Sequence, residues 1–281
     1  MKVIRSVSEM QLFGLRMKKQ GQSVGFVPTM GALHEGHLSL VRKARNENDV
    51  VVVSIFVNPT QFGPKEDFAR YPRTFARDQQ MIEKQHVDVL FAPPVQEMFP
   101  EGEAAWIDVQ GFEDTLCAPF RPGHFTGVAT AVAKLFNIVL PSHAYFGEKD
   151  YQQLRVIERM VKSLHFPVRV VAVRTVRETD GLAASSRNRY LSAKEREEAV
   201  KLYQMLFLGR ELIAEKIMLD PKQLKARLMR VLSTIPKVKV DYIEAVDPVT
   251  LVPMKRIQRP AILAAAIWLG KTRLLDNIFI P

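Results

Sequence analysis

Short apolar segments that alternate with helical patterns restrict the fold of this 281-residue chain more than any other feature. Each apolar segment ends in Pro, Gly or polar residues, as buried strands do. The five segments span residues 22–29, 49–58, 87–94, 143–150 and 168–175. Helical periods stand between them at 36–47, 74–85, 127–140 and 151–165. This alternation predicts an α/β fold with a Rossmann-like, doubly wound parallel sheet, which binds ligands beyond the carboxyl ends of its strands.

The pattern changes near residue 175, where helical segments at 192–217 and 221–233 precede three apolar strands separated by turn signals. We therefore expect a Rossmann-like nucleotide-binding domain over residues 1–174 and a smaller α+β C-terminal domain over 175–281. The sequence has no low-complexity linker at this boundary. Its absence favours two closely packed domains with a cleft between them.

Composition places the chain among ordinary globular proteins, with 47% apolar and 25% charged residues. It contains no apolar run of membrane-spanning length, and its start lacks the plan of a signal peptide. We therefore expect a cytoplasmic protein without a membrane partner. A single cysteine, Cys117, excludes an intramolecular disulfide, and we interpret it as a small core residue.

The net charge of +10 raises the question of nucleic-acid binding. Most of the excess follows residue 175, where 19 Lys and Arg stand against 12 Asp and Glu. These charges are interspersed with acids, and no basic stripe with interleaved aromatic residues is present. The distribution favours a polyanionic small molecule over a nucleic acid.

The strongest motif is MGALHEGH at residues 30–37, between a predicted strand and a predicted helix. A helix N-terminus carries unpaired N–H groups and a partial positive charge, which suit phosphate. His34 and His37 lie three residues apart and can both donate to phosphate oxygens, while Gly36 permits close approach of a nucleoside. The alternatives are a zinc pair, which would need a further ligand, and two surface histidines.

Two further loops carry cations and hydroxyl groups. In FGEKD at 146–150, Lys149 offers a flexible cation for phosphate, and Asp150 either binds a ribose hydroxyl or caps the next helix. In the 179–192 loop, Ser185 and Ser186 would donate to an anion that Arg187 chelates, with a hinge at Gly181. The alternative is an idle loop before a helix, which Ser192 is expected to cap.

Uncharged amides and one acid complete the candidates. Gln61 and Gln153 follow predicted strands and suit the hydroxyl and carboxylate of a small hydroxy acid. Asp78 lies on a predicted helix and is a candidate for approaching a magnesium ion, with a solvated helical face as the alternative. The loops at 71–74 and 121–125 are either walls of a substrate site or plain turns.

Six segments arrive in an order and spacing that closely resemble the pantoate–β-alanine ligases, a family of the HIGH-motif nucleotidyltransferases. The segments are PTMGALHEGH, SIFVNPTQF, YPRT, RPGHFTGVAT, FGEKDYQQL and VRETDGLAASSRNRYLS. The resemblance implies that pantoate attacks the α-phosphorus of ATP to give pantoyl adenylate and pyrophosphate. β-Alanine then displaces AMP to give pantothenate. It also implies Mg²⁺ on the phosphates, a homodimer, and a C-terminal domain that closes over the active site.

Roles follow from the resemblance position by position. His34, His37, Lys149 and Arg187 would be the catalytic residues, with His37 as proton donor. Gln61 and Gln153 in the first domain would bind pantoate, and Gln61 would also lie near β-alanine. The residues that would surround ATP are Met30, Gly31, Ala32, Leu33, His34, Glu35, Gly36, His37, Gly147, Glu148, Lys149, Asp150, Val176, Ala184, Ser185, Ser186 and Arg187.

One departure concerns Ala184, because the family commonly has Met there, which changes the packing expected over the base. The physical expectation is otherwise simple. A carboxylate nucleophile needs no general base, so positioning and charge neutralisation suffice for the first step. The alternatives are an adenylyltransferase that leaves AMP on its product and a nucleic-acid-binding module. The pair of glutamines argues against the first alternative, since it suits a carboxylate.

Overall fold

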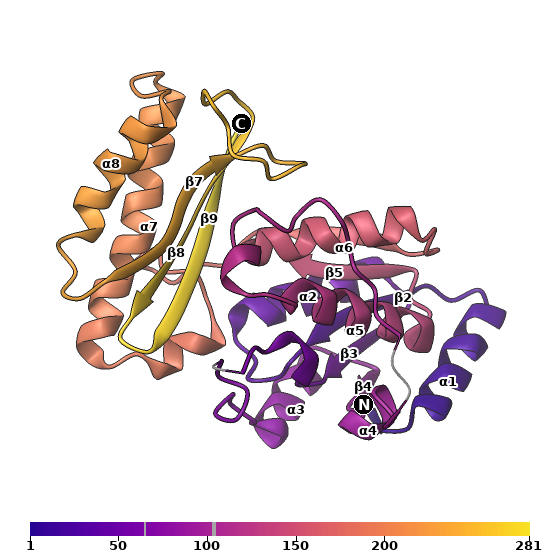
Figure 1. The fold of residues 1–281 in the computed structure, drawn as a ribbon. Helices are drawn as coiled ribbons and strands as arrows, with labels where there is room; N and C mark the ends of the chain where they lie inside the picture. Colours follow the sequence, from indigo (N-terminus) through magenta and orange to yellow (C-terminus); the bar gives the residue numbers. More distant parts are fainter. Residues whose placement is uncertain (65, 103–104) are drawn as a thin grey trace. The chain divides into compact units, whose positions relative to one another are not determined.

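The structure, a computed structural model, describes residues 1–64, 66–102 and 105–281. Within these residues, the first sheet is built of parallel strands in the order β1-β4-β3-β2-β5-β6. The strands are β1 (Lys2–Ile4), β2 (Val24–Thr29), β3 (Val50–Ile55), β4 (Val89–Phe91), β5 (His143–Gly147) and β6 (Arg169–Val173). The parallel, helix-flanked sheet expected from the sequence is confirmed (Figure 1).

Helices connect these strands, as the alternating pattern predicts. They are α1 (Val7–Lys19), α2 (Glu35–Glu47), α3 (Phe75–Glu83), α4 (Val95–Met98), α5 (His124–Val139) and α6 (Tyr151–Ser163). Strand β1 and helix α1 were not foreseen in the sequence. The strand has only three residues, and α1 exposes Leu12 and Leu15, so its apolar residues do not mark one buried face.

Both faces of the parallel sheet are covered. Leu40 and Val41 of α2 and Ile82 of α3 join a buried cluster with alternate residues of the strands. On the opposite face, Phe136 of α5 packs edge-on against Phe26 of β2, with the ring centroids 6.5 Å apart. Near-continuous burial of β2 and β3 follows from this double cover, which explains why these strands are uniformly apolar in the sequence.

The direction in which strands are added differs on the two sides of β2. From β2 the chain adds β3 and then β4 on one side, and it returns to place β5 on the other side of β2. At such a reversal the loops after the two central strands diverge and leave a crevice outside their carboxyl ends. Here these loops begin after Thr29 of β2 and Gly147 of β5, directly before the MGALHEGH and EKD segments.

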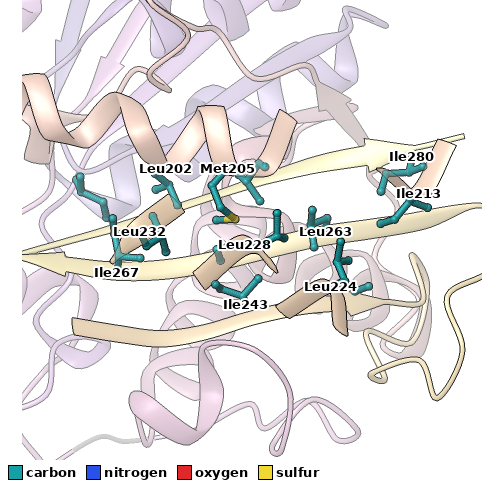
Figure 2. Packing of buried hydrophobic residues seen from close by; sticks show 14 of the residues in the cluster. Leu202, Met205, Ile213, Leu224, Leu228, Leu232, Ile243, Leu263, Ile267 and Ile280 are labelled. Atoms are coloured by element: carbon teal, nitrogen blue, oxygen red, sulfur yellow. The ribbon is translucent and has the colours of Figure 1, made fainter. Parts of the chain in front are cut away.

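The second sheet is antiparallel, with β7 (Lys239–Val246), β8 (Ala261–Leu269) and β9 (Thr272–Ile280) in sequence order. Helices α7 (Ala193–Ala214) and α8 (Pro221–Leu232) cover one of its faces, and Figure 2 shows Leu202, Leu228 and Ile267 as members of one buried cluster. The expected α+β unit is thus confirmed. Ser192 caps α7 in a capping box with Glu195, as expected.

The described chain divides into two compact units. The first comprises Met1–Val109, Arg121–Glu148 and Gln153–Arg174, and the second comprises Gln110–Phe120, Lys149–Gln152 and Thr175–Pro281. The two short segments in the second unit were not foreseen from the sequence. Cys117 lies in one of them and is buried, as expected. A separate finding is that the chain over residues 1–64, 66–102 and 105–281 contains no helix long and apolar enough to cross a membrane.

Candidate active site

The loop after β2 is held in a tight conformation by its own backbone and by Thr29. The Thr29 hydroxyl donates to the carbonyl of Ser54 at 2.7 Å and accepts from the N–H of Gly31 at 3.1 Å. Gly31 and Ala32 both have left-handed backbones, with φ of +80° and +51°. A Cβ on Gly31 would also lie 3.1 Å from Ile55, so this position requires glycine.

Asp78 of α3 fixes this loop. Its carboxylate is fully buried and accepts from the N–H groups of Ala32 at 2.8 Å and Leu33 at 2.9 Å. The hydroxyl of Thr74 donates to both oxygens at 3.1 Å. These bonds correct the assignment of Asp78 as a neighbour of magnesium, and equally the alternative of a solvated helical face. The carboxylate stabilises the loop, because these two buried N–H groups would otherwise have no acceptor.

The two histidines cap the helix that follows. His34 is the N-cap of α2, and its Nδ1 accepts from the N–H of Gly36 at 3.2 Å. The N–H of His34 in turn donates to Nδ1 of His37 at 3.4 Å, and the ring centroids lie 4.1 Å apart. A neutral imidazole whose Nδ1 accepts carries its proton on Nε2. Both rings therefore present an Nε2–H donor beside the N-terminus of α2.

Other residues of the predicted ATP-binding segment make contacts within the protein. Ala32 and Leu33 are fully buried, and their N–H groups are bound by Asp78. Glu35 is exposed and forms an ion pair with Arg42 on the same helix. Across the described parts of the chain, no three His, Cys, Asp or Glu side chains are grouped to hold a metal ion. The alternative of a zinc site at His34 and His37 therefore lacks its further ligand.

Gln61 and Met30 come together from the ends of β3 and β2. The Nε2 of Gln61 donates to the sulfur of Met30 at 3.0 Å, and its Oε1 accepts from Nδ2 of Asn58 at 3.1 Å. Asn58 is buried and also donates to the carbonyl of Gly127 on α5 at 3.1 Å. A predicted nucleotide-binding residue and a predicted pantoate-binding residue are thus in direct contact.

His124 and Arg121 hold the main chain at Gln61, a role that the sequence left open. Arg121 always donates, so its Nη1, at 2.8 Å from Nε2 of His124, makes that nitrogen an acceptor. The proton of a neutral His124 is then on Nδ1, which donates to the carbonyl of Gln61 at 2.8 Å. Arg121 is itself fixed by Glu66, with Nε 2.8 Å from Oε1.

The segment after β5 crosses from the first unit to the second at Lys149. Gly147 ends β5, and no described heavy atom beyond its chain neighbours lies within 4 Å of where its Cβ would stand, so the space beside it is open. The Nζ of Lys149 lies 3.6 Å from the carboxylate of Asp150, which is half exposed. Gln153 is partly buried in the first turn of α6.

In the second unit, the loop over 176–187 brings Val176 and Ala184 together. The N–H of Ala184 donates to the carbonyl of Val176 at 3.0 Å. Ser185 accepts from the N–H of Arg187 at 3.3 Å, and Ser186 is buried. Position 181 requires glycine, because a Cβ there would lie 2.0 Å from the ring of Tyr203. The hinge at this residue stays a prediction.

Known proteins resemble this chain over its whole length. The model of the pantoate-beta-alanine ligase family matches residues 2–279. The pantothenate synthetase of Sulfurihydrogenibium sp. is 52% identical over 279 residues, which is 99% of each chain, and that of Thermotoga petrophila is 52% identical over 281 residues and 99% of each chain.

Solved structures show the same fold. The crystal structure of pantothenate synthetase from Thermus thermophilus matches with a TM-score of 0.94 and 47% identity, covering 100% of this chain and 99% of the other. The pantoate-beta-alanine ligase from Francisella tularensis, complexed with beta-gamma ATP and beta-alanine, matches with a TM-score of 0.82 and 35% identity, covering 99% and 97%. The chain therefore belongs to the pantoate–β-alanine ligase family.

Proposed function

We propose that this protein condenses D-pantoate with β-alanine at the expense of ATP, through a pantoyl-adenylate intermediate. One observation carries the proposal beyond family membership. His34 and His37 present two Nε2–H donors at the N-terminus of α2, where the strand order reverses, and Gln61 follows the neighbouring strand. Donors of this kind suit a phosphate chain, and the carboxamide suits a small hydroxy acid beside it.

In the first step, a carboxylate oxygen of pantoate attacks the α-phosphorus, and the bond from that phosphorus to the bridging oxygen of pyrophosphate breaks. The carboxylate is already ionised, so no base is required, and alignment of the two substrates supplies much of the rate. Negative charge grows on the phosphate oxygens during the attack. The Nε2–H groups of His34 and His37 offset it, and that of His37 donates a hydrogen bond to the departing pyrophosphate.

In the second step, the amine of β-alanine attacks the acyl carbon of the adenylate. A C–N bond forms, the C–O bond to AMP breaks, and the proton that the amine nitrogen loses passes to water. Gln61 lies near both acids in this proposal, with Gln153 on pantoate. The Oε1 of Gln61 accepts from Asn58, which leaves its Nε2 to donate to a substrate oxygen once the weak contact with the sulfur of Met30 is exchanged.

The other ATP contacts are also proposals. Glu148, Lys149, Asp150 and Val176 would surround the nucleoside and phosphates, and Ser185, Ser186 and Arg187 would bind phosphate oxygens as donors. Ala184 is buried, and its N–H is bound within the loop, so its small side chain packs inside the protein.

Mg²⁺ is proposed as the companion of ATP. Mg²⁺ is commonly bound by substrate phosphates and water with only one or two carboxylates. The lack of a three-residue acidic or histidine group among the described residues fits that mode, and the buried, fully bonded Asp78 does not contribute. The chemistry that Mg²⁺ supplies is neutralisation of phosphate charge.

The experiment that tests the function measures pyrophosphate and AMP released from ATP, Mg²⁺ and D-pantoate, with and without β-alanine. We expect stoichiometric pyrophosphate without β-alanine, and continuous AMP and pantothenate when β-alanine is added. Chelation of the metal with EDTA should stop both. Pyrophosphate release that is indifferent to both acids would instead indicate an adenylyltransferase with another substrate.

Replacing Gln61 with Glu should weaken pantoate binding selectively. The new carboxylate would stand where the pantoate carboxylate binds, and like charges at close range disfavour each other. We expect the KM for pantoate to rise at least about tenfold, which corresponds to ~1.4 kcal/mol, while the KM for ATP changes little. Steady-state kinetics with each substrate varied in turn measure both. An equal rise in both constants would show that Gln61 supports the fold of the site and does not bind pantoate.

We also propose that the protein is a cytoplasmic homodimer. The family resemblance supports the dimer, and sedimentation of the purified protein measures it. Neither nucleic acid nor a membrane is required by this reaction.

A further inference from the structure

Asn277 of β9 is hydrogen-bonded to Lys149 within the second unit. Its side chain is buried, and its Nδ2 donates to the main-chain carbonyl of Lys149 at 2.8 Å. The two residues are 128 positions apart in the sequence. β9 is an edge strand of the antiparallel sheet, so this bond joins the sheet edge to the segment that follows β5.

The main chain of Asn277 is itself fixed on both sides. Its N–H donates to Oδ1 of Asp276 at 2.8 Å, and its carbonyl accepts from Nη2 of Arg177 at 3.1 Å. Arg177 and Asp276 form a two-pronged ion pair, with Nη1 2.6 Å from Oδ2 and Nη2 3.1 Å from Oδ1. Such paired bonds set the orientation of both groups. Asn277 therefore has a fixed position from which to hold Lys149.

Further contacts hold the ion pair between Arg177 and Asp276 in place. Arg177 donates to the carbonyl of Gly181 at 3.1 Å, and its guanidinium lies 4.4 Å from the ring centroid of Tyr203. Asp276 is only 3% exposed. Burial raises the pKa of Asp276, and the neighbouring charges of Arg177 and Lys149 act in the opposite direction. A buried pair of this kind is costly to break once formed, so the joint is rigid.

Lys149 needs such a support because its side chain is long. Four rotatable bonds separate the ammonium group from the backbone, so the position of the main chain decides which phosphate oxygens the ammonium can reach. We propose that Asn277 is a positioning residue for Lys149, and that it acts on ATP binding only through the main-chain carbonyl of Lys149. The inference rests on the proposed role of Lys149 in binding ATP.

The test is a double-mutant cycle that combines Asn277→Ala with Lys149→Ala. The readouts are the dissociation constant of a non-hydrolysable ATP analogue with Mg²⁺, measured by calorimetry, and the melting temperature. We expect Asn277→Ala to weaken binding of the analogue by about tenfold, within the range of coupling between residues in contact. In the Lys149→Ala background the same substitution should leave affinity unchanged, while it should lower the melting temperature equally in both backgrounds.

Thr272→Val provides the matched control. Thr272 is a buried polar residue at the start of the same strand and makes no hydrogen bond to Lys149 among the described contacts, so the substitution should leave nucleotide affinity as in the parent. If Asn277→Ala does not fold, Asn277→Ser, which keeps a shorter donor, replaces it in the cycle. Losses of affinity that add in the double variant, or unchanged affinity in Asn277→Ala, would overturn the inference.

Failure of the proposed function gives a different result. A protein that binds the ATP analogue but makes no pantothenate would refute the reaction and leave the cycle interpretable. Loss of affinity in Asn277→Ala with no effect of Lys149→Ala would refute the role of Lys149 and the inference together.

Discussion

Replacing His37 with Ala is expected to lower kcat for pantoate-dependent pyrophosphate release by about 10²–10³-fold, the usual cost of removing one charge-stabilising donor. His37 supplies one of the two Nε2–H groups at the start of α2, and its Nδ1 holds the N–H of His34. Because the phosphate charge that it offsets grows during the reaction, kcat should fall more than the KM for ATP rises. Rapid-quench measurement of pyrophosphate gives both constants.

Two variants make this result specific. His37→Gln keeps an amide donor on a flexible side chain and should recover part of the lost rate. His86→Asn changes an exposed histidine with a left-handed backbone, a conformation that Asn tolerates, and should keep the parental rate. If His37→Ala raised only the KM for ATP and left kcat intact, the histidine would bind ATP without stabilising the transition state.

Replacing Asp78 with Ala should cost about 3–5 kcal/mol of unfolding free energy. The buried N–H groups of Ala32 and Leu33 would both lose their acceptor, and each such loss costs roughly 1–3 kcal/mol. The left-handed backbone at Ala32 would also lose its support, so activity should fall even where the protein stays folded. Urea unfolding followed by circular dichroism measures the free energy.

A graded series separates this effect from a general loss of charge on α3. Asp78→Asn keeps one acceptor oxygen and should destabilise the protein by an intermediate amount. Glu83→Gln removes an exposed carboxylate from the last turn of the same helix and should change the unfolding free energy by less than about 0.5 kcal/mol. An Asp78→Ala variant as stable as Glu83→Gln would contradict the role of Asp78 in holding the loop. If Asp78→Ala lost activity but not stability, and excess Mg²⁺ restored the activity, Asp78 would be a magnesium-binding residue after all.

Local patterns in the sequence were enough for the fold class and for the histidine motif. The helical and strand patterns can be recognised because the number of residues per helical turn and the alternation of side chains along a strand are the same in every protein. His34 and His37 belong to one helix start, so their spacing alone placed them together, as the structure shows. Strand β1 and helix α1 were not recognised in the sequence. Three residues are too few to show a hydrophobic period, and α1 has no single apolar stripe.

Pairings between distant parts of the chain were decided only by the tertiary structure. Asp78 looked like a surface acid or a metal neighbour, and its actual partners at Ala32 and Leu33 are 46 and 45 residues away. Likewise, nothing in the local sequence around Asn277 indicates that it binds the main chain of Lys149.

The sequence by itself determined the α/β architecture, the family resemblance and the types of residue that are proposed to bind the nucleotide. The tertiary structure decided which nitrogen of each capping histidine accepts a bond, which acid holds the loop and which residue supports Lys149. The physical reason is the distance along the sequence between the residues that interact. Periodicity and capping depend on residues a few positions apart, whereas buried hydrogen bonds depend on where the packed sheets bring distant segments together.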